Sequence, residues 1–185
     1  MSRPDGKAIA ALFAQIGWTC EVVDENTVVT GYRCPVPGYH YPLLIEVKST
    51  PHWVYLRALL QREVGLTARG PVLRLVSEWN VHSRQAKFLL VQGCVLIQAE
   101  VPAVQWHAGT FQDLLQTVCR LGTYTGVEIA LIATDLTVGA LFEAVHRRAE
   151  ETSAHTLLGQ PEQDLDFDIS VNRIQEWSTP AEGDA

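Results

Sequence analysis

Two neighbouring runs of alternating apolar side chains constrain the fold of this chain more than any other feature of its sequence. In residues 43–49 the apolar side chains of Leu43, Ile45 and Val47 share one side of the strand, and residues 53–60 repeat the alternation after a break at Pro51. A period of two residues is that of a β-strand with one buried and one exposed face. The two runs therefore predict adjacent strands of an antiparallel sheet that is covered on one face only.

The segments around these runs predict four further strands and four helices. One hairpin is expected at residues 18–34, with its turn at Asn26, and another at residues 87–101, with its turn at Gln92 and Gly93. Strand runs interrupted by single helices are typical of the α+β class and not of a parallel α/β sheet. Apolar side chains at helical spacing predict helices near residues 8–16, 71–81, 110–124 and 135–148.

The two C-terminal helices carry recognisable capping residues. Thr110 is expected to cap the third helix and Asp135 the fourth. Tyr124 continues the apolar face predicted for the third helix, whereas Gly122 and Gly126 are expected to weaken that helix because glycine has a low helix propensity.

Composition places the chain among globular proteins. Its 185 residues are 47% hydrophobic and 19% charged, which is enough apolar side chain for a core and too little charge for a disordered polypeptide. The sequence shows neither a secretory leader nor an apolar stretch long enough to span a bilayer, so we expect a cytoplasmic protein with no membrane partner. The four cysteines form no CxxC pair and are expected to be reduced core residues: Cys20, Cys34, Cys94 and Cys119.

Charge is distributed unevenly along the chain. Residues 150–185 carry nine acidic residues and one arginine, so that this segment has a net charge of −8 and the rest of the chain +1, within a total of −7. A neutral body lacks the basic surface that direct nucleic-acid binding requires. We therefore expect an α+β domain at residues 1–133, an additional helix at residues 134–150 and an acidic, mobile tail at residues 151–185.

Residues 72–100 resemble the central part of the YbjN family. That family has a leucine-rich helix with an asparagine-containing turn after it, then a strand with lysine and phenylalanine, a glycine turn and a strand that ends on an acidic residue. The resemblance implies a fold similar to type III secretion chaperones, which are usually dimeric, with no known chemistry. In this sequence the matching positions are Leu75, Trp79, Asn80, Lys87, Phe88, Gly93 and Glu100.

The sequence contains no recognisable catalytic or cofactor-binding motif. Glycine-rich nucleotide loops, zinc-protease motifs and nucleophile elbows do not occur, and the six histidines lack ligand spacing. We therefore expect no cofactor and no metal. The alternative is an enzyme that uses Cys34 as a nucleophile with His40 as its base, although nothing in their spacing orients one toward the other.

Two features of the sequence are candidates for protein binding. Trp53, Tyr55 and Arg57 share the exposed face of one strand, and these residue types are the ones most enriched at interface hot spots. The alternative is that they cover a helix or a dimer partner. In the acidic segment, Leu165, Phe167 and Ile169 alternate with acidic residues, a pattern that suits a pocket surrounded by lysine and arginine; the alternative is a solvated tail.

Together these features predict a protein-binding adaptor or chaperone-like protein that acts as a homodimer and is not an enzyme. The expected partner is a protein client, with residues 134–150 as the segment that two copies would exchange. An alternative is a regulator of a basic nucleic-acid-binding protein in DNA metabolism or the stress response, reached through the acidic tail. Direct nucleic-acid binding is not expected.

Overall fold

The computed structural model describes residues 3–33 and 42–157. The contacts divide the chain into two units, residues 1–144 and residues 145–185, and the sheet with the helices that cover it belongs to the first unit. The order of elements is one helix, four strands, one helix, two strands and two helices, which is the predicted order. The predicted α+β class is confirmed.

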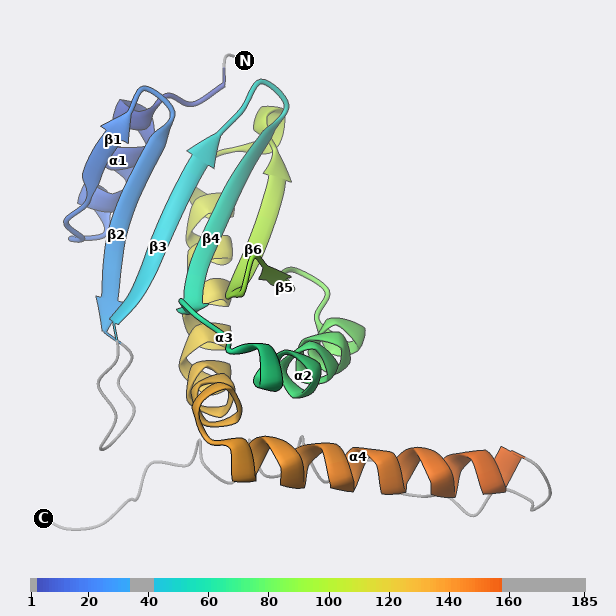
Figure 1. Cartoon of the computed structure of the whole chain (residues 1–185). Coiled ribbons are helices and arrows are strands. Elements are labelled where there is room, and N and C mark those ends of the chain that lie inside the picture. Colours follow the sequence, from blue (N-terminus) through green and yellow to red (C-terminus); the bar gives the residue numbers. More distant parts are fainter. Residues whose placement is uncertain (1–2, 34–41, 158–185) are drawn as a thin grey trace, which may run out of the picture. The chain divides into compact units, whose positions relative to one another are not determined.

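A six-stranded antiparallel sheet forms the centre of the first unit (Figure 1). Its strands lie in the order β1-β2-β3-β4-β6-β5, so β1 and β5 are the two edges. The predicted hairpins and the predicted β3–β4 pair are all present. The strands are β1 (Glu21–Asp24), β2 (Thr27–Arg33), β3 (Pro42–Ser49), β4 (Trp53–Gln61), β5 (Lys87–Val91) and β6 (Cys94–Pro102).

The first strand begins later than predicted. The sequence predicts a strand from Trp18, but β1 starts at Glu21 because the preceding residues are used to close the first helix. The backbone N–H of Trp18 donates to the carbonyl of Phe13 at 2.9 Å, and the indole of Trp18 stacks on Tyr32. As a result β1 has only four residues.

Three helices contribute to the core of the sheet (Figure 1), and a fourth begins at the end of the third. Asp5 caps the first helix by accepting a hydrogen bond from the N–H of Ala8 at 2.8 Å, and Asp135 caps the fourth as predicted. The helices are α1 (Gly6–Gln15), α2 (Arg69–His82), α3 (Ala108–Thr134) and α4 (Leu136–Leu157), with short 3-10 turns η1 (Leu66–Ala68) and η2 (Ala103–Gln105).

The predicted cap of α3 is wrong. His107, not Thr110, is the N-cap residue, and its Nδ1 accepts a hydrogen bond from the N–H of Thr110 at 3.2 Å. The hydroxyl of Thr110 also lies 2.8 Å from Nε2 of His107. Thr110 is therefore in the first turn of the helix, where its N–H needs an acceptor and its own side chain cannot supply one.

One face of the sheet packs against the helices and forms the core. Every second residue of the central strands points into it, and the pattern predicted from the alternation is confirmed for β3 and β4. Phe13 of α1 and Phe111 of α3 meet edge to face in the middle, with ring centroids 4.9 Å apart. The fully buried strand residues include Val28, Leu43, Ile45, Val47, Val54, Leu56, Ala58, Val95 and Ile97.

The glycines of α3 are packing residues and not weak points. Gly122 and Gly126 are both buried, and a Cβ atom on Gly122 would lie 2.6 Å from Cδ2 of Leu43. The missing side chain thus lets α3 lie close against β3. Tyr124, which was predicted on the apolar face, is 48% exposed on the other side of the helix.

Four of the residues that carry the YbjN resemblance lie together between α2 and β5: Trp79, Asn80, Lys87 and Phe88. Trp79 and Phe88 are in ring contact, with centroids 4.8 Å apart. The YbjN resemblance implies that Asn80 lies in the turn after the helix, but it lies within α2, which continues to His82. Its side chain does not terminate the helix. Instead it hydrogen-bonds the backbone of Phe88 on the neighbouring strand.

Candidate protein-binding surface

The outward face of the sheet lies on the side opposite α1 and α3 and is not covered by any helix in the part of the chain that the structure describes (Figure 1). We call the outward side chains of β3, β4, β6 and β5 the open face. Trp53, Tyr55 and Arg57 all belong to it, because the residues between them on β4 point into the core. No helix within residues 3–33 and 42–157 is therefore covered by these three side chains.

A polar cluster occupies the centre of the open face. The guanidinium of Arg57 donates from Nε to Oε1 of Gln98 at 2.7 Å and lies 3.7 Å from the carboxylate of Glu46. It also sits over the ring of Tyr55, 5.1 Å from the centroid. Gln98 in turn donates to Glu100 at 3.1 Å. These contacts come from three adjacent strands, and they hold Arg57 in one place.

The fixed position of Arg57 limits what the cluster can do. Its side chain and that of Glu46 are 36% and 37% exposed, so the ion pair contributes about 0–1 kcal/mol to stability. An arginine already paired with a carboxylate and stacked on a ring presents its planar edge in a defined direction. Such a side chain suits recognition of a protein surface by shape and hydrogen bonding.

Beside the polar cluster runs a row of leucines that the sequence interpretation missed. Leu44, Leu59 and Leu96 stand opposite one another on β3, β4 and β6, and Leu89 continues the row onto β5. Leu44 is 44% exposed. The alternation of residues 87–101 contains this signal for Leu89 and Leu96, but within the sheet only aromatic residues and arginine were predicted to bind. Apolar side chains in register across four strands form a continuous contact surface.

Trp53 lies at the end of the open face away from the leucine row. It is 39% exposed and stands opposite Pro102 of β6. Trp53 begins the strand after the turn at Thr50, whose hydroxyl accepts a hydrogen bond from the N–H of Trp53 at 3.0 Å. Trp53, the polar cluster and the leucine row therefore follow one another along the strands.

The other predicted site residues lie outside the described part of the chain. This applies to Leu165, Phe167 and Ile169 and also to the proposed nucleophile and base, Cys34 and His40. The functional role of Trp53, Tyr55 and Arg57 stays a prediction, although their common face is now established.

The described thiols and acidic groups do not form a reactive constellation. Cys20, Cys94 and Cys119 are free, and burial raises the pKa of the Cys20 thiol, which lowers the fraction of nucleophilic thiolate. In residues 3–33 and 42–157 no three His, Cys, Asp or Glu side chains are grouped so that they could hold a metal ion. Taken singly, no described helix has both the length and the apolar composition of a membrane span.

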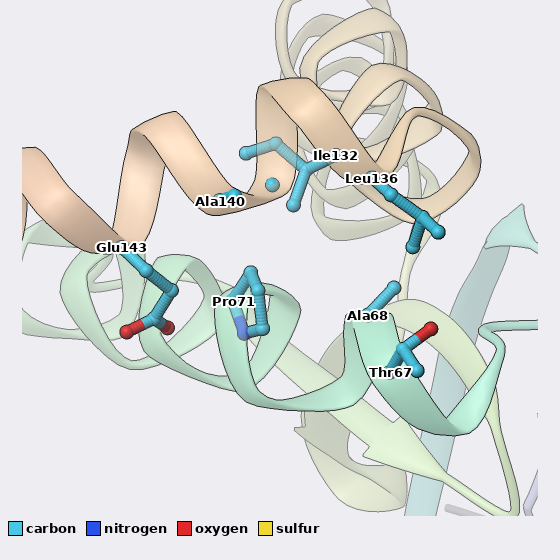
Figure 2. Close-up of a pocket in the computed structure, with 8 residues that line it drawn as sticks. Thr67, Ala68, Pro71, Ile132, Leu136, Ala140 and Glu143 are labelled. Carbon is cyan, nitrogen blue, oxygen red and sulfur yellow. The ribbon is translucent and has the colours of Figure 1, made fainter.

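A small pocket lies where α2, α3 and α4 meet, with a volume of about 280 Å³ (Figure 2). Its lining is mostly aliphatic, from Pro71 and Ala68 on one side and Ile132, Leu136 and Ala140 on the other. The only carboxylate in the lining belongs to Glu143, and it lies 3.5 Å from Nε of Arg74. This pocket has no acid–base pair and is smaller than a typical ligand site.

Comparison with solved structures supports the fold. The crystal structure of YbjN from E. coli matches with a TM-score of 0.51 at 10% identity, covering 68% of this chain and 93% of that one. Neither the sequence profile of a protein family nor a curated protein sequence matches the chain. The predicted resemblance to YbjN is therefore confirmed for the fold.

Two further solved structures match with lower scores. The ExsC–ExsE complex has a TM-score of 0.49 at 16% identity, covering 70% of this chain and 94% of that one. The heterodimeric ExoU–SpcU complex from the type III secretion system of Pseudomonas aeruginosa has a TM-score of 0.42 at 15% identity, covering 65% of this chain and 96% of that one.

Proposed function

We propose that this chain is a non-enzymatic, chaperone-like adaptor that binds a protein client through the open face of its sheet. The observation that carries the proposal is an uncovered sheet face on which an exposed tryptophan, a fixed arginine and a row of leucines follow one another along the strands. Tryptophan, tyrosine and arginine are the residues that contribute most to protein interfaces, and they do so within apolar surroundings that exclude water.

The arrangement favours a folded or helical client surface over a small molecule. The open face carries apolar and polar side chains in rows, whereas the described pocket is small and almost without polar groups. A protein surface can contact several rows at once, and a small ligand cannot bury most of its surface on an open sheet. The cytoplasm remains the expected compartment, which fits three free thiols.

The experiment compares capture of proteins from the native cell by the wild type and by two open-face variants. Trp53→Ala removes the exposed aromatic residue and Leu44→Ser interrupts the leucine row. We expect both to lose the same captured proteins by at least about tenfold, as hot-spot truncations do. Leu73→Ala is the matched control, because Leu73 is 53% exposed on α2, away from the open face.

The proposal fails if the captured proteins are the same for the open-face variants and for the wild type. It also fails if Leu73→Ala removes the same proteins, since the loss would then not be specific to the open face. The melting temperature of each variant should be measured in parallel, so that loss of capture by an unfolded variant is not counted.

We also propose that the chain forms a homodimer through the helix at residues 134–150. Leu136 and Leu141 are 64% and 65% exposed on α4, and a second copy of the chain would cover them. Sedimentation of the wild type and of the Leu136→Ser/Leu141→Ser variant tests this. An unchanged mass for the variant would contradict it.

The client that we propose for the acidic segment is a basic protein. One such client is a nucleic-acid-binding protein, and this chain would then act as its regulator. Residues 150–185 have a net charge of −8, which attracts a positively charged partner at low salt. The domain limits predicted at residues 133 and 150 remain part of this proposal. Truncation after Leu157 should weaken capture of basic proteins and leave the other captured proteins unchanged.

A further inference from the structure

Helix α3 begins at a capping residue whose side chain can change its charge. His107 has an extended backbone, and Nδ1 of its ring accepts a hydrogen bond from the N–H of Thr110 at 3.2 Å. The carbonyl of His107 accepts the first backbone hydrogen bond of the helix, from the N–H of Phe111 at 2.9 Å. Serine, threonine, aspartate and asparagine are the usual residues at this position, because their side-chain oxygens accept hydrogen bonds. An imidazole accepts one only while a ring nitrogen carries no proton.

The contacts of His107 indicate which ring nitrogen carries the proton. Because Nδ1 accepts from Thr110, we assign the proton of the neutral ring to Nε2, which then donates to the hydroxyl of Thr110 at 2.8 Å. That hydroxyl donates in turn to the carbonyl of Gln105 at 3.1 Å. Each donor in this series has one acceptor. The arrangement is therefore complete for one tautomer of the neutral imidazole.

Gly109 leaves room for the ring to fold back over the start of the helix. A Cβ atom on Gly109 would lie 3.2 Å from Cε1 and 3.3 Å from Nδ1 of His107, which is closer than a Cβ atom normally approaches a neighbour. The backbone of Gly109 does not need glycine, because its φ is not positive. Glycine is otherwise unfavourable inside a helix. The position of the imidazole therefore explains why residue 109 has no side chain.

A second proton on the ring removes the cap and adds an unfavourable charge. Protonated Nδ1 is a donor, so it no longer accepts from the N–H of Thr110, and two donors then point at each other. The positive charge also lies at the N-terminus of α3, where the helix dipole disfavours cations. Both effects act in the same direction. Histidine is the side chain that changes its charge between about pH 5 and 8, so the change occurs near physiological pH.

The surroundings of His107 do not compensate for this charge. Within residues 3–33 and 42–157 the ring makes no ion pair with a carboxylate and no hydrogen bond to any side chain except that of Thr110. The titratable side chains on the neighbouring elements are Glu100 of β6, His52 of the β3–β4 turn and Asp113 of α3. Since His107 is exposed, a proton reaches the ring directly from solvent.

We propose that His107 is a pH-sensitive cap, which holds the first turn of α3 in place when its ring is neutral and releases the turn when its ring is protonated. This turn is held from outside by Trp106, whose ring meets Phe111 edge to face with centroids 5.7 Å apart. Only η2 and Trp106 separate His107 from Pro102, which stands opposite Trp53 at the end of the open face. The proposal goes beyond the proposed function and does not require that a client binds.

The first test is the melting temperature of the full-length protein at about pH 7.5 and about pH 5.5. His107→Asn keeps a capping side chain that does not titrate, and His107→Ala removes the cap at both pH values. Relative to His107→Asn, the wild type should lose about 2–4 °C as the pH falls, which is the shift that loss of one cap produces in a chain of this size. The difference between the two variants should not change with pH.

His82 provides a control with the opposite sign. It lies in the last turn of α2, where the helix dipole favours a cation. Relative to His82→Gln, the wild type should therefore gain about 1–2 °C as the pH falls from about 7.5 to about 5.5. Because each comparison keeps all other titratable groups, including His52, their contributions cancel.

The second test locates the change in the structure. In the ¹⁵N spectrum of the wild type, the amides of Thr110 and Phe111 and the indole N–H of Trp106 should shift between the two pH values. The same signals should stay in place in His107→Asn. Gly109→Ala pushes the ring away from the helix and should remove at least half of the pH-dependent loss in melting temperature.

Three results would overturn the proposal. The first is an equal loss of melting temperature for the wild type and His107→Asn as the pH falls, and the second is the same pH dependence for His107→Ala and the wild type. The third is a set of pH-dependent shifts that centres on His52 or His82 and leaves the signals of residues 106–111 in place.

Discussion

The β5 edge of the sheet is blocked at Phe88 by two hydrogen bonds from Asn80, whereas the β1 edge borders solvent with two half-exposed valines. Both are edges of the same antiparallel sheet and both belong to hairpins. The difference arises from the neighbouring helix. α2 packs against β5 and carries an amide side chain that can replace a strand. α1 covers the inner face beside β1, and the N–H of its Gly6 donates at 2.7 Å to the carbonyl of Glu25, which lies just beyond the strand.

This comparison distinguishes edge groups that stabilise the fold from edge groups that are available to bind a partner. The groups at the β5 edge have partners within the fold, so changing them should cost stability. The groups at the β1 edge have few partners, so changing them should leave stability almost unaltered and should alter binding instead.

The largest expected difference is in hydrogen exchange. The Phe88 amide donates to a part-buried acceptor at 2.8 Å, whereas Val23 has no opposite residue in the ladder. We expect Phe88 to exchange about a thousandfold more slowly than Val23, which corresponds to about 4 kcal/mol of opening free energy. Native-state exchange followed by NMR measures both amides in one experiment. Similar rates would contradict the difference between the edges.

The next largest effect is expected for Asn80→Leu. Leucine keeps the helix propensity and leaves both backbone groups of Phe88 without partners, which should lower the free energy of unfolding by about 2–3 kcal/mol. Urea denaturation measures it. Asn80→Asp retains the acceptor for the Phe88 N–H and should cost less, while Ser77→Ala, exposed on the same helix, should stay within about 0.5 kcal/mol.

Asn80→Leu should also change how the β5 edge behaves. With the amide gone, this edge resembles β1, and the Phe88 amide should exchange about as fast as that of Val23. If the variant is destabilised but the Phe88 amide still exchanges slowly, blocking of the edge depends on other parts of α2.

The sequence was sufficient to predict which residues form the central strands. It was insufficient to predict whether an edge of the sheet is blocked. Alternation in residues 43–60 correctly predicted which side chains of β3 and β4 are buried, because burial of one sheet face imposes a period of two. Blocking of the β5 edge depends on where α2 ends. The YbjN resemblance placed Asn80 in the turn after this helix, whereas the apolar spacing continued the helix to residue 81, because helix boundaries are weakly encoded.

The second source of error in the sequence-based predictions was packing between elements that are far apart in the sequence. Gly122 was interpreted through helix propensity, yet its absent side chain is required by Leu43 of a strand far away in the sequence. The leucine row of the open face was missed for a related reason. Leu44, Leu59 and Leu96 belong to three strands, and only the register brings them opposite one another.

A smaller loss of stability is expected at the turn that joins β5 to β6. Gly93 has φ 82°, and a Cβ atom would lie 3.2 Å from Nη2 of Arg69. Gly93→Ala should therefore cost about 1–2 kcal/mol. Gly31→Ala on β2 is the matched control, because Gly31 has open space around it and no positive φ; it should be neutral or slightly stabilising. Equal losses for the two variants would show that the hairpin turn is not specially constrained.

The smallest change in stability is expected at the β1 edge itself. Val23→Thr and Glu21→Gln alter side chains that are exposed in the structure, so each should change the free energy of unfolding by less than about 0.5 kcal/mol. Threonine keeps the β-branched shape that strands favour, and glutamine keeps the size of glutamate while removing its charge. Urea denaturation of the two variants beside Asn80→Leu gives the comparison directly. A loss above 1 kcal/mol for either variant would mean that the β1 edge contributes to the fold, and a partner strand would then compete with contacts that already exist.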